Sequence, residues 1–172
     1  MPVITEKQIF GWAQGWAKNK GGEIVRNFMQ KGGWEGWAQV ELTNVFQTLP
    51  GDGVVNVERE VHAYENARQA VDIKITDVNQ QKSFLVELKC ESLFASADSA
   101  TQQAGNRFYL NFQDDIQKLR SRTRQQSIPL ALMFIISDEA RRETDSYFGD
   151  NVQREDFSLP DGWTLSIYLA VC

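Results

Sequence analysis

Alternating apolar and polar residues predict strands in the middle and at the end of this chain. A period of two is typical of a strand with one buried face, and a short unbroken apolar run indicates a strand buried on both faces. Turn-forming residues separate these segments. We therefore expect strands at 54–64, 70–75, 83–90, 128–136 and 163–171.

Apolar residues spaced three and four apart predict helices between and before these strands. Thr5 is placed to cap the first of them, because its hydroxyl can accept a hydrogen bond from a free N–H of the first turn. The segment 149–162 is expected to be a loop. The expected helices are 6–17, 23–31, 34–48, 108–122 and 138–148.

The helix at 34–48 carries acids close to its buried side. Its apolar stripe consists of Trp34, Trp37, Ala38, Leu42, Val45 and Phe46. Glu41 falls near the middle of this stripe, and Glu35 lies toward its edge. Because acidic side chains are rarely buried without a partner, an acid on a core-facing stripe needs a structural or functional reason.

The hairpin predicted at 70–90 also carries charge where a sheet normally buries neutral groups. Glu87 and Lys89 are two residues apart, so both side chains are expected on one face of the sheet. Asp72 can face them from the neighbouring strand. A carboxylate in apolar surroundings costs several kcal/mol unless it is paired or binds a cation. Two carboxylates beside a lysine are the groups that a divalent metal and a positioned water require.

The length of 172 residues and mass of 19.6 kDa favour a single domain with a sizeable core. Within it we distinguish an N-terminal helical extension (1–33), a central core (34–137) and a C-terminal helix, loop and strand (138–172). No apolar run is long enough for a membrane span, and the N-terminus lacks the pattern of a secretory signal. Two cysteines make no disulfide framework. An intracellular, cytoplasmic protein without a membrane partner is expected.

The net charge of −5 and the pI near 5.0 argue against broad, non-specific binding of nucleic acid. Acids gathered around a metal lower the pI, however, and a local basic strip can still contact phosphate. The basic residues that end the helix at 108–122 are such a strip, or they simply favour the helix dipole: Lys118, Arg120, Arg122 and Arg124.

Asp72, followed fifteen positions later by Glu87-Leu88-Lys89, resembles the signature of the PD-(D/E)XK nuclease superfamily. Ala70-Val71 stands where the name of that superfamily has a proline. The order helix, three strands, helix, strand over 34–137 agrees with its core. The resemblance implies an α/β protein (an α+β mixed sheet) with a restriction-endonuclease-like αβββαβ core and extra N-terminal helices.

The resemblance also implies a hydrolase, a magnesium-dependent phosphodiesterase that cleaves DNA in preference to RNA. Asp72, Glu87 and the backbone carbonyl of Leu88 would bind Mg²⁺ or Mn²⁺. Lys89 would orient the attacking water or stabilise charge on the phosphoryl group. Glu41 is the residue expected to supply a further acid from the preceding helix, with Glu35 as the fallback.

Other interpretations stay open at this point. Asp72 and Lys89 would form an ordinary cross-strand salt bridge if their face of the sheet is solvated. The chain would then be a catalytically inactive nuclease-fold protein with a binding or regulatory role. A third interpretation is a nuclease toxin that a protein partner or inhibitor keeps inactive. A homodimer would supply the two sites that a double-strand cut usually needs. His62, the only histidine, is expected to have a structural or surface role.

Overall fold

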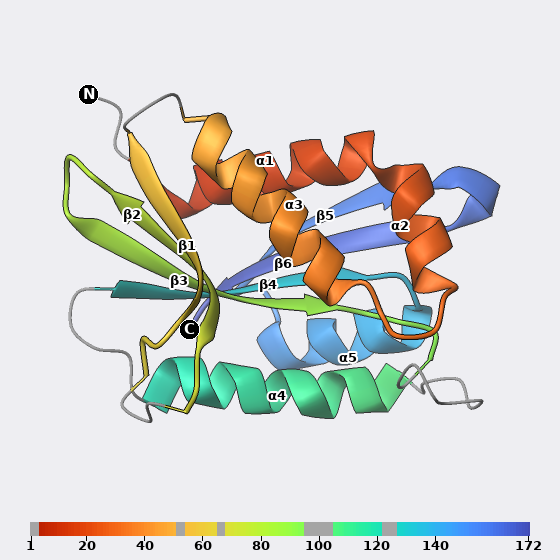
Figure 1. The fold of residues 1–172 in the computed structure, drawn as a ribbon. Helices are drawn as coiled ribbons and strands as arrows, with labels where there is room; N and C mark the ends of the chain where they lie inside the picture. Colours follow the sequence, from red (N-terminus) through yellow and green to blue (C-terminus); the bar gives the residue numbers. More distant parts are fainter. Residues whose placement is uncertain (1–3, 51–53, 65–67, 95–104, 122–126) are drawn as a thin grey trace.

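A six-stranded mixed sheet separates two layers of helices in the computed structural model, which describes residues 4–50, 54–64, 68–94, 105–121 and 127–172. One layer contains α1 (Glu6–Asn19), α2 (Gly21–Phe28) and α3 (Glu35–Thr48), and the other contains α4 (Gly105–Ser121) and α5 (Asp138–Phe148) (Figure 1). The strands are β1 (Val55–Val61), β2 (Val71–Asp77), β3 (Lys82–Cys90), β4 (Ser127–Ile135), β5 (Gln153–Ser158) and β6 (Thr164–Val171), and a short 3₁₀ turn, η1, spans Pro160–Gly162.

The strands follow the spatial order β1-β2-β3-β4-β6-β5. Among the strand pairs of the described residues, β3 and β4 alone are parallel, and α4 lies in the connection between them. A parallel pair needs such a crossover, whereas the antiparallel β2 and β3 are joined by a tight turn. The predicted mixed α/β class and the order helix, three strands, helix, strand are therefore observed, with β6 and β5 extending the same sheet.

Two apolar cores lie on the two faces of the sheet. Alternate residues of β3 point to opposite faces, so Phe84, Val86 and Leu88 are buried with the helices α1–α3, and Leu85 is buried under α4. The side chains of Glu87 and Lys89 share the face of Leu85. This alternation positions both charged side chains on the α4 side of the sheet.

Local interactions fix the helices that approach this part of the sheet. Thr5 caps α1 as predicted, since its hydroxyl accepts the N–H of Gln8 while the Gln8 side chain accepts the N–H of Thr5. Trp34, the residue before α3, is buried and donates from its indole Nε1 to the carbonyl oxygen of Glu91 at 2.7 Å. The start of α3 is therefore tied to the chain directly after β3.

The prediction of a loop at 149–162 is wrong, because β5 lies within it and pairs antiparallel with β6. Three of the six residues of this strand are exposed and charged, and β5 is the last strand in the sheet order. An edge strand of this kind needs no apolar alternation, so the pattern that predicts buried strands does not detect it. No helix in the described part of the chain is long and apolar enough to cross a membrane.

Candidate functional site

β2 and β3 separate before either strand ends, and this fork forms the candidate site. Their ladder runs from Asp77 opposite Lys82 to Ile73 opposite Val86. Beyond that pair β3 continues to Cys90 and stays paired with β4 on its other side. The next residues at the fork are Asp72 on β2 and Glu87 on β3. The edge of β3 that faces β2 is thereby opened to side chains.

Beyond the fork, side-chain carboxylates accept hydrogen bonds from backbone N–H groups of β3 that no longer pair with β2. Asp72 Oδ2 accepts the N–H of Leu88 at 2.7 Å, and Glu35 Oε2 accepts the N–H of Cys90 at 3.1 Å. Backbone groups must find partners when a ladder ends, and these two acids supply them. A strand residue directs its N–H and C=O to the same edge, so the carbonyl of Leu88 also lies at the fork.

Asp72 and Glu87 approach each other closely enough to share a hydrogen bond between their carboxyl groups. Tyr64 donates from its hydroxyl to Glu87 Oε1. Gln39 Nε2 donates to Asp72 Oδ1 at 3.1 Å, and Arg59 donates to the side-chain oxygen Oε1 of Gln39 at 2.6 Å. The donors that hold the two acids in place are therefore neutral.

The pKa values of this pair reflect that environment. Burial, then the charge of Asp72, raise the pKa of Glu87 to about 8, although the hydrogen bond from Tyr64 opposes the rise. Burial also raises the pKa of Asp72, and Asp115 adds to the effect, while the Leu88 N–H counteracts it. The two adjacent carboxyl groups do not readily lose both protons. A positive charge bound next to them would therefore stabilise their charged forms.

Lys89 lies beside the pair but makes its ion pairs with other acids. Its Nζ is 3.2 Å from Asp115 Oδ2 on α4 and 3.7 Å from Glu35 Oε2 on α3. Burial alone would lower the pKa of Lys89, but Glu35, Asp115 and Asp72 together raise it above the usual value. Burial likewise raises the pKa of Glu35, and Lys89 limits that rise. Lys89 is thus kept protonated.

The structure brings together Asp72, Glu87, Lys89 and the backbone of Leu88, as predicted, but it does not bring Glu41 to them. Glu41 Oε2 lies 3.2 Å from Lys20 Nζ and accepts a hydrogen bond from the Trp16 indole at 3.4 Å. Glu35, the fallback, reaches the fork instead. The prediction that Glu41 lies in the site is therefore wrong.

The physical reason is the direction in which α3 buries its surface. Its buried residues are Ala38, Gln39, Leu42 and Phe46. Glu35 lies four residues before Gln39 and shares its side of the helix, so both reach the open edge of β3. The wide tryptophan-rich stripe placed the centre of the buried surface too close to Glu41, which faces α1 and not the sheet.

A cross-strand salt bridge between Asp72 and Lys89, the alternative for a solvated face, is not observed between these two described residues, because Lys89 pairs with Glu35 and Asp115. Of the basic cluster, Lys118 pairs with Asp115 and Arg120 contacts Tyr147. Arg122 and Arg124 lie outside the described residues. The interpretation of a simple solvated salt bridge is therefore weaker than the interpretation of a buried polar cluster.

Three residues of the site were not found from the sequence: Gln39, Tyr64 and Asp115. Asp115 had a detectable signal, because it lies three residues after Phe112 and four before Leu119 on the apolar side of α4. An acid beside a core-facing stripe is the same signal that drew attention to Glu41. Gln39 and Tyr64 are ordinary residues for a helix and a strand end, and their role depends on tertiary placement.

The donor set decides which metal this site suits. Within the described residues, no group of three or more histidine, cysteine, aspartate or glutamate side chains is arranged to hold a metal ion. Two carboxylates and a backbone carbonyl are too few protein ligands for a closed zinc site. Mg²⁺ is commonly held by one or two carboxylates, with water and substrate phosphate completing its shell, so these residues fit Mg²⁺ or Mn²⁺.

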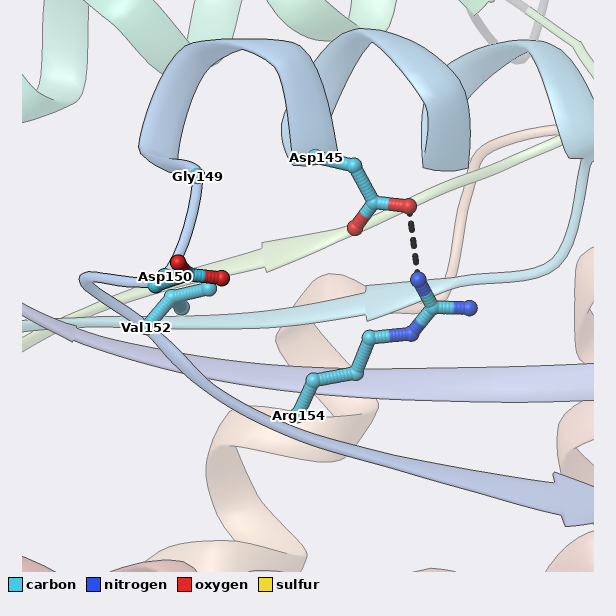
Figure 2. A pocket seen from close by; sticks show the side chains of 5 residues that line it. All are labelled: Asp145, Gly149, Asp150, Val152 and Arg154. Atoms are coloured by element: carbon cyan, nitrogen blue, oxygen red, sulfur yellow. Dashed lines mark hydrogen bonds and ion pairs between the residues drawn. The ribbon is translucent and has the colours of Figure 1, made fainter.

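A separate cavity of about 430 Å³ lies where α5 leads into β5, lined by Asp145, Gly149, Asp150, Val152 and Arg154 (Figure 2). Arg154 pairs there with Asp145 at 2.6 Å and with Asp156 at 2.9 Å. Tyr168 also donates to Asp145 at 2.8 Å. Arg154 is therefore already engaged by acids in this cavity, as Lys89 is at the fork.

Comparisons with models of protein families, with curated proteins and with solved structures gave no match to this chain. The family suggested by the sequence signature consequently remains a resemblance. The case for a function depends on the geometry at the fork, where Asp72, Glu87 and Lys89 meet.

Proposed function

We propose that this protein is a metal-dependent nuclease of the PD-(D/E)XK type, which hydrolyses phosphodiester bonds of DNA in preference to RNA. The observation that carries the proposal is the contact between the carboxyl groups of Asp72 and Glu87 at the fork of β2 and β3, with Lys89 beside them. The order α3, β1, β2, β3, α4, β4 supports it, because a restriction-endonuclease-like core has that order.

The raised pKa values of Asp72 and Glu87 support a divalent cation as the missing partner of this pair. Asp72, Glu87 and the carbonyl of Leu88 would hold Mg²⁺ or Mn²⁺. A metal bound there would polarise the phosphoryl group and lower the pKa of an attacking water. Binding would replace the shared proton, because the cation stabilises both carboxylates in their charged form.

The protein's own groups position the reacting atoms. Gln39 and the N–H of Leu88 hold the two oxygens of Asp72, and Tyr64 holds one oxygen of Glu87. Pre-oriented carboxylates need no rearrangement when the substrate arrives. The Lys89 ammonium, kept charged by Glu35 and Asp115, would stabilise negative charge that develops on the phosphate oxygens.

A cleavage assay tests this proposal. Supercoiled plasmid, single-stranded DNA and RNA are incubated with the protein in Mg²⁺, in Mn²⁺ and in excess chelator. We expect metal-dependent cleavage that chelator and the Glu87→Gln variant abolish, with DNA cut faster than RNA. Glu41→Gln is the matched control, since Glu41 lies away from the fork. Absence of cleavage by the unaltered protein on all three substrates overturns the proposal.

A catalytically inactive binding or regulatory protein is the second candidate. The observation that favours it is the position of Lys89, which is held between two acids, in a chain with a net charge of −5. Titration calorimetry separates the two candidates. Mg²⁺ or Mn²⁺ binding that is lost in Asp72→Asn supports the nuclease, and no binding at millimolar metal supports the inactive scaffold.

A further inference from the structure

A cavity of about 290 Å³ lies on the same face of the sheet as the candidate site. Lys74 and Leu85 line it, and these two residues are directly opposite each other in the β2–β3 ladder. Lys74 is two residues after Asp72, and Leu85 is two residues before Glu87. Two residues of a strand span roughly 7 Å, so the cavity is the next position along the sheet from the carboxylate pair.

The polar side chains that line this cavity can all donate hydrogen bonds, and none of its described lining residues is acidic: His62, Lys74, Ser83 and Ser127. Ser83 and Ser127 face each other across the β3–β4 ladder. Ser83 is also within 3.1 Å of the Thr76 hydroxyl, which fixes its position. The cavity therefore presents donors from three neighbouring strands and the residue after β1.

Lys74 is available to an anion because its present ion pair is weak. Its Nζ lies 3.7 Å from Glu58 Oε2, and the two side chains are 31% and 46% exposed. An exposed pair of this kind contributes little, since water screens both charges. A phosphate group accepts stronger, charge-assisted hydrogen bonds from an ammonium and from hydroxyl donors. Little stability is therefore lost when Lys74 exchanges Glu58 for a phosphate partner.

We infer that this cavity binds a backbone phosphate of DNA adjacent to the one that is cleaved, an inference that rests on the proposed nuclease function. The cavity has the volume of about ten water molecules, which accommodates a phosphate with part of its sugar. Its distance from the carboxylate pair is comparable to the length of one nucleotide. This subsite also gives an acidic protein a local means of holding DNA.

Kinetics with a single-stranded thymidine oligonucleotide tests the subsite. Lys74→Gln should raise KM by about tenfold and leave kcat nearly unchanged, because one charge-assisted contact is lost away from the reacting atoms. Lys82→Gln is the matched control. Lys82 lies in β3 on the opposite face, is 35% exposed and pairs with Glu6 at the same 3.7 Å, so its removal should leave KM unchanged.

A binding experiment without metal separates the subsite from the nuclease. His62 is the only histidine, so its imidazole proton signals in NMR report on the cavity without assignment. Titration with inorganic phosphate, and separately with the thymidine oligonucleotide, should shift these signals to saturation. The shift should weaken in Lys74→Gln and persist in Lys82→Gln.

The outcomes distinguish the two proposals. A saturable His62 shift by the oligonucleotide in a protein that never cleaves DNA supports the subsite and overturns the nuclease. Cleavage with an unchanged KM in Lys74→Gln, and no His62 shift, overturns the subsite and leaves the nuclease standing. A shift produced by free phosphate but not by the oligonucleotide shows a small-anion site and also overturns the DNA subsite.

Discussion

Asp72 and Asp77 belong to the same strand, β2, and lie in opposite electrostatic environments. Asp77 ends the strand and is fully buried. Its Oδ1 accepts the N–H groups of Asn79 and Gln80 at 2.9 and 3.0 Å, and its Oδ2 accepts that of Ile4 at 3.1 Å. Burial alone would raise its pKa, but these backbone donors lower it below the usual value.

Asp72 also accepts a backbone hydrogen bond, from Leu88, yet its pKa is raised. The difference is that burial outweighs the single Leu88 N–H in raising the pKa of Asp72, and Asp115 adds to the rise, whereas three backbone N–H groups lower the pKa of Asp77. One aspartate stabilises a turn and ties down the N-terminal segment. The other belongs to a cluster that carries an electrostatic cost for folding, which is typical of functional sites.

The largest expected effect separates the two aspartates by activity. Asp72→Asn should reduce Mg²⁺-dependent DNA cleavage by about a hundredfold or more, because the amide removes the negative charge that binds the cation; this loss equals about 2.7 kcal/mol of transition-state stabilisation. Asp77→Asn should retain cleavage at a temperature where it stays folded. Equal activity of the two variants would show that Asp72 has no special role.

The second prediction concerns stability, for which we expect the replacement of Asp77 to have a larger effect than the replacement of Asp72. Asp77→Ala removes the acceptor for three backbone N–H groups and should lower the free energy of unfolding by about 3 kcal/mol. Asp72→Asn should leave stability unchanged or increase it, because a buried charge is removed while the amide oxygen can still accept the Leu88 N–H. Urea denaturation followed by tryptophan fluorescence measures both. A larger loss in Asp72→Asn than in Asp77→Ala would contradict this comparison.

The third effect is a dependence of stability on pH that comes from Glu87. Folding raises its pKa from 4.5 to about 8, so the folded state holds a proton that the unfolded state has released. Stability contributed in this way is fully present below pH 4.5 and is lost as pH rises toward 8. We expect a decrease of about 5 kcal/mol across this range in metal-free protein, because each unit of pKa difference corresponds to about 1.4 kcal/mol.

Two controls sharpen that measurement. Glu87→Gln should flatten the pH dependence between 4.5 and 8, because no carboxyl group remains to titrate there. Asp77 acts in the opposite direction, since its lowered pKa stabilises the fold above its ordinary value of 3.8 and that stability is lost as pH falls below it. A pH profile that Glu87→Gln leaves unaltered would show that Glu87 does not hold the proton.

The sequence predicts the part of the site that lies along the hairpin, because strand alternation is a local property. Asp72, Glu87 and Lys89 could be assigned to one face from their spacing alone, and the hydrogen bond between the carboxyl groups of Asp72 and Glu87 confirms that these two lie next to each other. The same reasoning separates the two cores, since the apolar residues of β3 alternate between them.

The remaining parts depend on tertiary placement that spacing does not contain. Tyr64 and Asp115 reach the fork from segments far away in the chain, and no local pattern relates them to Glu87. The exposed edge strand β5 has no apolar alternation to detect. For α3 the periodicity was correct, but the choice between two acids on neighbouring sides of the helix required the position of α1.

The smallest effect tests that choice directly. Glu41→Gln weakens a partly exposed pair with Lys20 and should change stability by no more than about 0.5 kcal/mol, with cleavage unaltered. Glu35→Gln keeps an oxygen to accept the Cys90 N–H but removes a charge beside Lys89, so cleavage should fall about fivefold with little loss of stability. Parallel cleavage assays and urea denaturation measure both variants. A loss of cleavage in Glu41→Gln but not in Glu35→Gln would contradict this choice. It would mean that α3 rotates in the active protein and moves Glu41 from its contact with Trp16 of α1 to the fork.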